Sequence, residues 1–332
     1  MLRLTGLVSA LALATALSGC AAMGASSDMP PVPASAVAAA DYVRDVHSHA
    51  RPEIARVRHV SLDLTADFAA QVLSGTATLD VQGVPGANEV VLDVRDLDIR
   101  NVTDAAGAPL QYETGAPAEF IGQPLTVRFP ALAPGATQRI VIHYATRPDA
   151  AALQWLTPAQ TAGGEEPYLF SQGQAILTRT WVPTQDSPGI RQTWDARIVA
   201  PSDLKAVMSA EMLTPEGEPA GEGLTAWRFR MTNPVPPYLI ALGVGDVDFA
   251  AIDERTGVWT EPSELRAAHD ELVPTADMGR GRTAVRPLPL GPLRPAGAAA
   301  ELPLRRHGEP APDLRHPDHH RRRPVAGVAG GA

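Results

Sequence analysis

Hydrophobic and polar residues alternate in short runs from residue 57 onward. Val60, Leu62 and Leu64 alternate with polar residues, and the same period of two recurs over 77–81 and 140–144. A period of two places one set of side chains on one face of a β-strand. Breaks that contain Gly, Pro or Asn separate the runs, at 83–88, 104–109, 114–117 and 130–136. The pattern predicts antiparallel sheets packed as a sandwich.

Other segments fit the same architecture. Further strands are expected over 88–94, 124–129, 190–200, 224–232 and 238–249. The run 238–247 is almost entirely apolar, which is typical of a strand covered on both faces. We expect no amphipathic helix of three turns before residue 261. About 190 residues of this kind can bury one sizeable core, so the sequence predicts a mainly β domain over residues 53–246.

The stretch 171–188 carries the side chains best suited to recognise a ligand. The carboxamides of Gln172 and Gln174 flank Gly173, and alternate side chains of an extended segment point to one face. Each amide offers one acceptor and two donors, and the glycine allows a backbone or a ligand to approach closely. Asp186 follows, between two prolines. The structural alternative is an edge strand that runs into a proline turn.

Four motifs in this chain resemble those of the N-terminal domain of M1 zinc aminopeptidases, nearest the leukotriene A4 hydrolase branch. They are Gln-Gly-Gln-Ala at 172–175, Pro-x-x-Asp-x-Pro at 183–188, Ala-Val-Met-Ser-Ala at 206–210 and Pro-Val-Pro-Pro-Tyr-Leu-Ile-Ala-Leu-Gly-Val-Gly at 234–245. The similarity follows the family's order and spacing over residues 51–278. It implies a saddle-like β domain whose Gln-x-Gln-Ala strand reaches into the catalytic cleft. It also implies that Gln172 and Gln174 contact the first residue of a peptide substrate, and that Ala175 lines the cleft.

The resemblance also places the start of an α/β zinc-peptidase domain at 247–278. Within it, residues 258–260 would open a small sheet and 261–277 would form the first helix. Ser263 is the expected N-cap of this helix, and Pro274 would kink or end it.

Intact relatives would bind one zinc ion through two histidines of His-Glu-x-x-His and a downstream glutamate. The glutamate of that motif would activate a zinc-held water. The chain contains no His-Glu-x-x-His, so we expect no catalytic residue, no metal site and no peptidase activity in this chain alone. His47 and His49 could share a strand face as a metal site, but no third ligand is near them in the sequence, and both are expected to be solvated.

Residues 1–20 have the pattern of a bacterial lipoprotein signal peptide. One charge, Arg3, precedes an apolar run over 4–17 that is too short to span a bilayer. The run ends in Leu-Ser-Gly-Cys, which resembles a lipobox, so Cys20 is the expected lipidation site. The alternative is an unmodified cysteine beside an ordinary cleavage site.

Ala21 after the cysteine favours the outer membrane. We therefore expect a lipid-anchored protein of the bacterial cell envelope that faces the periplasm, with residues 21–52 as a tether. Cys20 is the only cysteine, which excludes a disulfide within one chain.

The composition changes after Met278. Residues 279–332 contain no aromatic residue, ten Arg against four acidic residues, and nine of the 32 prolines. The tail could be a basic arm for nucleic acid or anionic lipid, or a His-rich metal tract at 316–320. It could also be an out-of-frame, disordered product. A shift of one base allows 293–310 to encode Gly-Gly-Met-Glu-Asn, the family's substrate-binding signature, so the frameshift is the favoured interpretation.

Without this tail the chain carries 18 basic and 33 acidic residues, which disfavours nucleic-acid binding. The sequence therefore predicts a truncated M1 aminopeptidase lipoprotein whose partners are a peptide substrate and, through Cys20, the membrane. The alternative from another functional class is a membrane-tethered β-sandwich that binds peptide or protein without catalysis. The sequence carries no signal for an oligomeric state.

Overall fold

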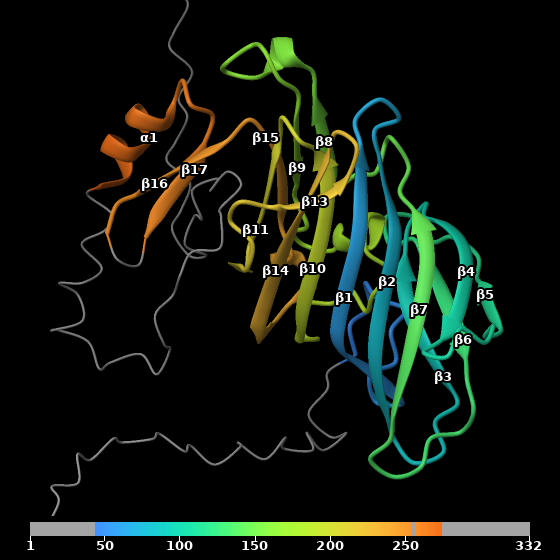
Figure 1. Ribbon diagram of the computed structural model, residues 1–332. Helices are drawn as coiled ribbons and strands as arrows, with labels where there is room; N and C mark the ends of the chain where they lie inside the picture. The colour runs from blue at the N-terminus through green and yellow to red at the C-terminus, as the bar shows by residue number, and fades with distance from the viewer. Residues whose placement is uncertain (1–43, 254–255, 274–332) are drawn as a thin grey trace, which may run out of the picture. The chain divides into compact units, whose positions relative to one another are not determined.

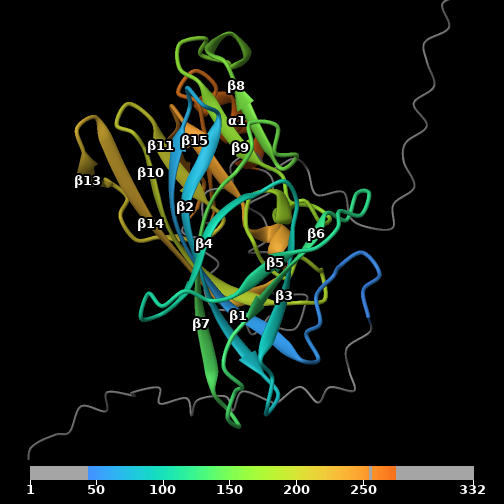
Figure 2. The same ribbon diagram turned by 90° about the vertical axis from the view of Figure 1, so that its right-hand side faces the viewer.

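The structure, a computed structural model, describes residues 44–253 and 256–273. This part of the chain is mainly β and contains sheets of eight, four, three and two strands (Figures 1 and 2). The predicted signal peptide, Cys20, most of the predicted tether, Pro274 and the tail 279–332 lie outside the described residues.

The largest sheet has the strand order β12-β14-β10-β1-β2-β7-β4, and β13 also pairs with β14. Its strands are β1 (Ala55–Asp67), β2 (Val72–Gly83), β4 (Asp98–Asp104), β7 (Thr137–Ala145), β10 (Gln192–Pro201), β12 (Glu211–Met212), β13 (Glu218–Gly221) and β14 (Leu224–Val235). The predicted alternation sets the register, because Val60 lies opposite Leu79 and Leu79 opposite Ile140, and all three are fully buried.

One pairing differs from the predicted antiparallel pattern. β1 and β10 run parallel, from His59 opposite Thr193 to Thr65 opposite Val199. These strands are far apart in the sequence, so no tight hairpin turn forces them to run in opposite directions. The sheet is therefore mixed at this one pair.

Two smaller sheets complete the β domain. One has the order β3-β6-β5, and the other has the order β11-β15-β9-β8. Their strands are β3 (Glu89–Val94), β5 (Tyr112–Thr114), β6 (Gln123–Arg128), β8 (Leu153–Leu156), β9 (Tyr168–Ser171), β11 (Lys205–Met208) and β15 (Leu242–Gly245).

The single strand predicted over 238–249 is divided into three parts. A 3-10 helix, Pro237–Leu239, is followed by β15 and then by β16 (Asp248–Ala251). Pro237 has no backbone N–H, and its carbonyl accepts the N–H of Ile240 at 2.9 Å, which begins a helical turn rather than a strand. Only β15 is buried throughout, as the apolar run predicted.

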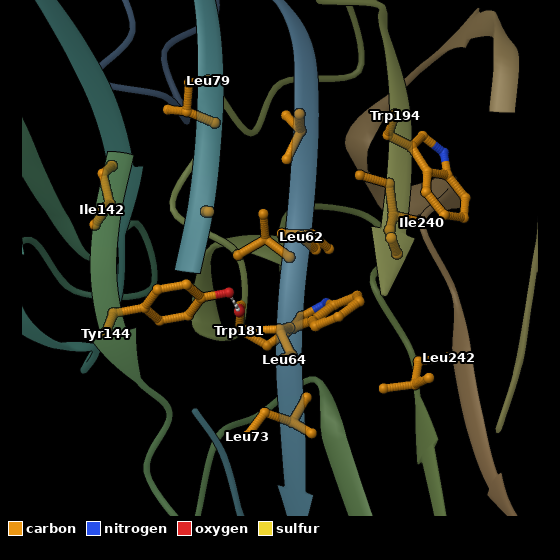
Figure 3. Close-up of a cluster of buried hydrophobic side chains, with 14 of the residues drawn as sticks. Leu62, Leu64, Leu73, Leu79, Ile142, Tyr144, Trp181, Trp194, Ile240 and Leu242 are labelled. Carbon is orange, nitrogen blue, oxygen red and sulfur yellow. Dashed lines mark hydrogen bonds between the residues drawn. The ribbon is translucent and has the colours of Figure 1, made fainter. Parts of the chain in front are cut away.

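Apolar side chains from all three sheets of the β domain form one core. Figure 3 shows part of it, where Leu62 and Leu64 of β1 lie beside Trp181 and Ile142 lies farther along on β7. The hydroxyl of Tyr144 donates a hydrogen bond to the carbonyl of Trp181 at 2.9 Å. Trp181 lies within the candidate ligand-binding stretch 171–188, so the core fixes the middle of that stretch.

The described chain ends in a hairpin and a short helix. β16 pairs antiparallel with β17 (Gly257–Thr260), which contains the predicted small-sheet residues. The helix α1 (Leu265–Leu272) begins later than predicted, and its N-cap is Glu264 rather than Ser263, while residues 274–277 of the predicted helix lie outside the described part. Glu264 donates its backbone N–H to the carbonyl of Glu261, so a turn occupies the start of the predicted helix. None of the helices in the described residues has the length and apolar character needed to cross a bilayer.

Candidate functional site

The segment that carries the paired amides is a turn. β9 ends at Ser171, residues 172 and 173 are irregular, and a turn begins at Gln174. The side-chain oxygen of Gln172 accepts the backbone N–H of Gln174 at 2.9 Å. The expectation that the two amides extend from a strand is wrong: Gln172 still donates its backbone N–H to the carbonyl of Ala152 at 2.7 Å, but the chain turns from Gln174 onward. The peptide bond between Gln174 and Ala175 is cis.

The three residues that the family resemblance assigned to substrate binding are all exposed. Gln172, Gln174 and Ala175 face solvent, and only Gly173 between them is buried. The single oxygen of the Gln172 carboxamide accepts a hydrogen bond within this segment, and its NH₂ group is left as a donor. The structure thus brings the predicted residues together on one accessible segment, residues 172–175, which we call the amide turn.

Gly173 lies against the backbone of Tyr238. A Cβ at Gly173 would lie 3.0 Å from both the Cα and the carbonyl oxygen of Tyr238, and 2.8 Å from Oγ1 of Thr178. No larger residue fits without a shift of its neighbours, which confirms that the glycine permits a close approach. The approaching backbone belongs to the chain itself, so the contact fixes the turn.

Three of the four sequence motifs meet in the four-stranded sheet. β11, from the 206–210 motif, pairs with β15, from the 234–245 motif, and β15 pairs with β9 directly before Gln172. The hydroxyl of Ser171 accepts the backbone N–H of Leu242 at 2.8 Å, and Ser209 Oγ donates to the carbonyl of Leu239 at 2.5 Å. The motifs therefore anchor the start of the amide turn.

The remaining motif, at 183–188, supplies Asp186, one of the three charged residues of a buried ionic cluster. Arg179 is fully buried and Asp186 is 1% exposed. Oδ2 of Asp186 accepts the backbone N–H of Arg179 at 3.0 Å and its Nε–H at 3.1 Å, while Arg179 Nη2 donates to the carbonyl of Asp186 at 2.6 Å. Arg179 Nη1 donates to the carbonyl of Ile121 at 2.5 Å. Arg179 thus links the 183–188 motif to the loop that contains Ile121.

Asp93 of β3 is the second carboxylate of the cluster. It lies 3.8 Å from Arg179 Nη1 and accepts the backbone N–H groups of Asp186 at 2.9 Å and His49 at 2.7 Å. The hydroxyl of Ser48 donates to it at 2.6 Å. A buried carboxylate requires such donors. Residues 44–52, which the sequence assigned to the tether, are consequently bonded to the β domain.

The cluster holds two carboxylates and one guanidinium away from water. Burial raises the pKa of Asp186 to about 6, although the charge and hydrogen bonds of Arg179 lower it in part. Burial also raises the pKa of Asp93, against the same opposing charge and its own donors. The cluster has no exposed atom for a ligand to touch. Its role is therefore to hold backbone segments together.

The sequence analysis did not identify Asp93 or Arg179. Both carried a readable signal, because each is a charged residue inside a mostly apolar run, at 90–94 and 176–182. Charged residues are almost never fully buried unless they are paired, so two such positions of opposite charge predict a partnership. Their pairing across 86 residues of sequence could not be read from spacing alone.

The part of the chain that the structure describes offers no zinc centre. The described residues contain no group of three His, Cys, Asp or Glu close enough to hold a metal ion. The side chain of His47 is 68% exposed, as expected. His49 is partly buried, and its Nε2 lies 3.3 Å from the carbonyl oxygen of Gly122, so it is less solvated than expected.

Comparison with known proteins gives a consistent result. Residues 56–239 match the family model for the peptidase M1 N-terminal domain. Leukotriene A-4 hydrolase of Xenopus laevis is 34% identical over 236 residues, which cover 70% of this chain and 39% of that protein. Aminopeptidase B of Mus musculus is 34% identical over 246 residues, which cover 68% of this chain and 37% of that protein.

The fold agrees with the sequence match. The structure of yeast LTA4 hydrolase in complex with bestatin superimposes with a TM-score of 0.66 at 27% identity, over 74% of this chain and 37% of that one. The chain thus spans less than two fifths of the length of these relatives. Because the family model covers more than half of the chain, and does so over the β domain and its motifs, the chain belongs to the M1 peptidase family through its N-terminal domain.

Proposed function

We propose that this chain is the leading part of an M1 metalloaminopeptidase, and that its exposed amide turn contributes to peptide binding. The observation that carries this proposal is the placement of Gln172 and Gln174. The two carboxamides are exposed, while the turn beneath them is fixed by Tyr238 and by the end of β9. A fixed pair of amides can bind a peptide carbonyl and amine with little loss of conformational entropy.

The chain as written is expected not to hydrolyse peptides. Amide donors can position a peptide, but they supply neither a nucleophile nor strong stabilisation of the charge that develops on the carbonyl. The printed sequence contains no His-Glu-x-x-His, and the described residues contain no metal-ligand cluster. Zinc would supply the activated water in intact relatives.

The helix α1 supports the proposal that the second domain is only a fragment here. It has apolar residues, including Leu265 and Leu272, yet none of its residues is buried. An amphipathic helix normally covers its apolar face with another layer. We propose that the frame changes after Met278, and that sequencing the locus will reveal His-Glu-x-x-His one base out of register beyond residue 332. An absence of that motif would overturn the frameshift.

Activity and binding can be separated in one set of experiments. The purified full chain should show no zinc-dependent cleavage of aminoacyl-arylamides, and any such turnover would disprove the inactivity. A tripeptide titrated against the ¹⁵N-labelled chain should shift side-chain amide signals of Gln172 and Gln174. Gln172→Ala with Gln174→Ala should abolish the shifts, whereas Gln111→Ala, at an exposed position elsewhere, should leave them unchanged. Shifts that survive the double variant would remove the amide turn from the site.

Anchoring at Cys20 is a separate part of the proposal. The lipobox-like sequence and the single cysteine support lipidation and placement in the cell envelope, with the outer membrane favoured by Ala21. Labelling of cells with a radioactive fatty acid should mark the wild-type chain and not Cys20→Ala. Fractionation should then move the variant from the membrane to the soluble fraction. Equal labelling of both chains would contradict the anchor.

A non-catalytic binding module remains the second candidate. It is favoured by the same observation, an exposed amide turn on a folded β domain without metal ligands among its described residues. The sequence of the locus distinguishes the two, because a module of this kind needs no downstream zinc motif.

A further inference from the structure

An aromatic cavity lies beside the four-stranded sheet, apart from the amide turn. Tyr168 and Phe170 lie two residues apart and therefore on the same face of β9. Leu156 of β8 lies opposite Tyr168 on the neighbouring strand. The ring of Tyr168 packs against Gly245 of β15. A Cβ at Gly245 would lie 2.1 Å from Cδ2 of Tyr168, so the tyrosine ring occupies the space above that glycine.

The opposite wall comes from the segment that follows the β domain. Val247 and Trp259 line the cavity, together with Glu261. The volume is about 280 Å³, near the lower end of the range for small-molecule sites. The cavity therefore suits a ligand of a few heavy atoms.

Glu261 places a fixed negative charge at the edge of this cavity. Its Oε2 accepts the backbone N–H of Ala162 at 2.7 Å, which holds the side chain in place. The same carboxylate is close enough to Tyr168 to act on its hydroxyl. Burial raises the pKa of Tyr168 to about 12, and the charge of Glu261 adds to that increase.

One ring of the cavity, that of Trp259, already has a cation beside it. The ammonium group of Lys205 lies 5.4 Å from the centroid of Trp259, and it is paired with Asp248 at 3.8 Å. Lys205 does not line the cavity, and Asp248 offsets its charge. Aromatic rings beside a carboxylate form the environment in which substituted ammonium groups bind.

We propose that this cavity binds a small substituted ammonium ion. Its cationic group would lie between Glu261 and the rings of Tyr168 and Trp259, and its apolar body would contact Leu156 and Phe170. The proposal does not depend on peptide binding at Gln172 and Gln174. The ligand is either a free quaternary ammonium compound or a lipid headgroup, since both present the same trimethylammonium group.

Choline and 3,3-dimethylbutan-1-ol test the proposal, because they have the same shape and differ in charge. In calorimetric titrations of the full chain, choline should bind about tenfold more tightly than the neutral alcohol. Glu261→Gln should reduce choline affinity to that of the alcohol, because the amide oxygen still accepts the N–H of Ala162 while the charge is lost. Glu264→Gln, at an exposed position outside the cavity, is the matched control and should bind choline as the wild type does.

A second variant guards against loss of the local fold. Trp259→Leu should lower choline affinity further than it lowers alcohol affinity, with the far-ultraviolet circular dichroism spectrum unchanged. Equal affinities for choline and the alcohol, or choline binding that Glu261→Gln leaves intact, would overturn the proposal. Vesicles of phosphatidylcholine and of phosphatidylglycerol distinguish the sources. Glu261-dependent binding that is tighter for phosphatidylcholine vesicles than for free choline identifies a headgroup, whereas binding of free choline without binding of these vesicles identifies a free quaternary ammonium compound.

Discussion

The β domain and the hairpin–helix segment, residues 248–253 and 256–273, belong to the same chain but differ in what they bury. In the β domain, alternating residues such as Val60, Leu79 and Ile140 are completely removed from solvent. Among the described residues of the hairpin–helix segment, none is buried, and Phe249 is 44% exposed. Both regions have strands with apolar residues, so the pattern alone does not create a core.

The difference arises from the number of layers. The large sheet faces two smaller sheets, and all three contribute to one core. Among the described residues, α1 is the element that packs most against the hairpin, and Lys205 and Glu261 link this segment to the β domain. Two strands and one short helix cannot exclude water from both sides of an apolar residue. We therefore expect substitutions to have large effects in the first region and small effects in the second.

The largest effect should come from the buried guanidinium. Arg179→Met leaves Asp93 and Asp186 buried without their counter-charge, and the loss of one partner of a buried pair costs about 3–5 kcal/mol. Arg266→Met, in α1 where the side chain is 96% exposed, should leave the free energy of unfolding unchanged. Urea denaturation followed by tryptophan fluorescence measures both. Equal effects at the two arginines would mean that the two regions fold as one unit.

A matched pair of leucines tests the packing itself. Leu64→Ala removes a fully buried side chain of β1 and should lower the free energy of unfolding by about 3 kcal/mol. Leu265→Ala, in a helix with no buried residue, should lower it by less than about 1 kcal/mol. The same denaturation curves provide the measurement. A cost at Leu265 near that at Leu64 would show that α1 has a covered apolar face.

The glycine of the amide turn should give an intermediate effect. Gly173→Ala places a Cβ 3.0 Å from the backbone of Tyr238 and 2.8 Å from Thr178, so overpacking should cost about 1–3 kcal/mol. Gly163→Ala is the control, because the nearest atom would lie 3.9 Å away. Thermal unfolding of both variants compares them. A Gly173→Ala protein as stable as the control would show that the turn is free to move.

Local periodicity predicted much of the β domain, because one residue in two had to face the core. It placed the apolar residues of β1, β2 and β7, and it identified the apolar run that became β15. It could not predict the parallel pairing of β1 with β10, since that depends on how distant segments are brought together. It also began a strand at residue 238, where a 3-10 turn that starts at Pro237 occupies residues 238 and 239 instead.

The sequence identified the residues of the candidate site but not the conformation of the backbone that carries them. Gln172 and Gln174 are both exposed, as expected for a binding site. The side-chain oxygen of Gln172 accepts the backbone N–H of Gln174, and the chain turns there where a strand was expected. The support beneath it was also missed, because the partnership of Asp93 with Arg179 joins segments far apart in the sequence. A local pattern reports local geometry, whereas a buried charge pair is a property of the completed fold.

The pH dependence of stability should also separate the two regions. The folded-state pKa of Asp186 is raised to about 6, above its value in the unfolded chain. The folded protein therefore binds a proton that the unfolded chain releases between about pH 4 and 6. The contribution of this group to the free energy of unfolding increases as the pH falls through that window.

Asp186→Asn removes this dependence. Between pH 7 and pH 5, the stability of the wild type relative to the variant should rise by about 1 kcal/mol. Urea denaturation at the two values measures the change. Asp270→Asn, with an exposed carboxylate in α1, is the control and should run parallel to the wild type. A difference that stays constant or reverses between the two values would show that Asp186 is ionised throughout.

The smallest effect should appear only in the hairpin. Lys205→Met removes the cation over Trp259 and the pair with Asp248, while the apolar stem is kept. A cation–π contact at a partly exposed site contributes about 0.5–1 kcal/mol, so amide hydrogen exchange in β16 and β17 should become about two- to fivefold faster. Exchange in β1 should not change, because the β domain keeps its core. If hydrogen exchange in β1 becomes faster to the same extent, the hairpin opens only when the whole molecule unfolds. The two regions would then differ in solvent exposure but not in stability.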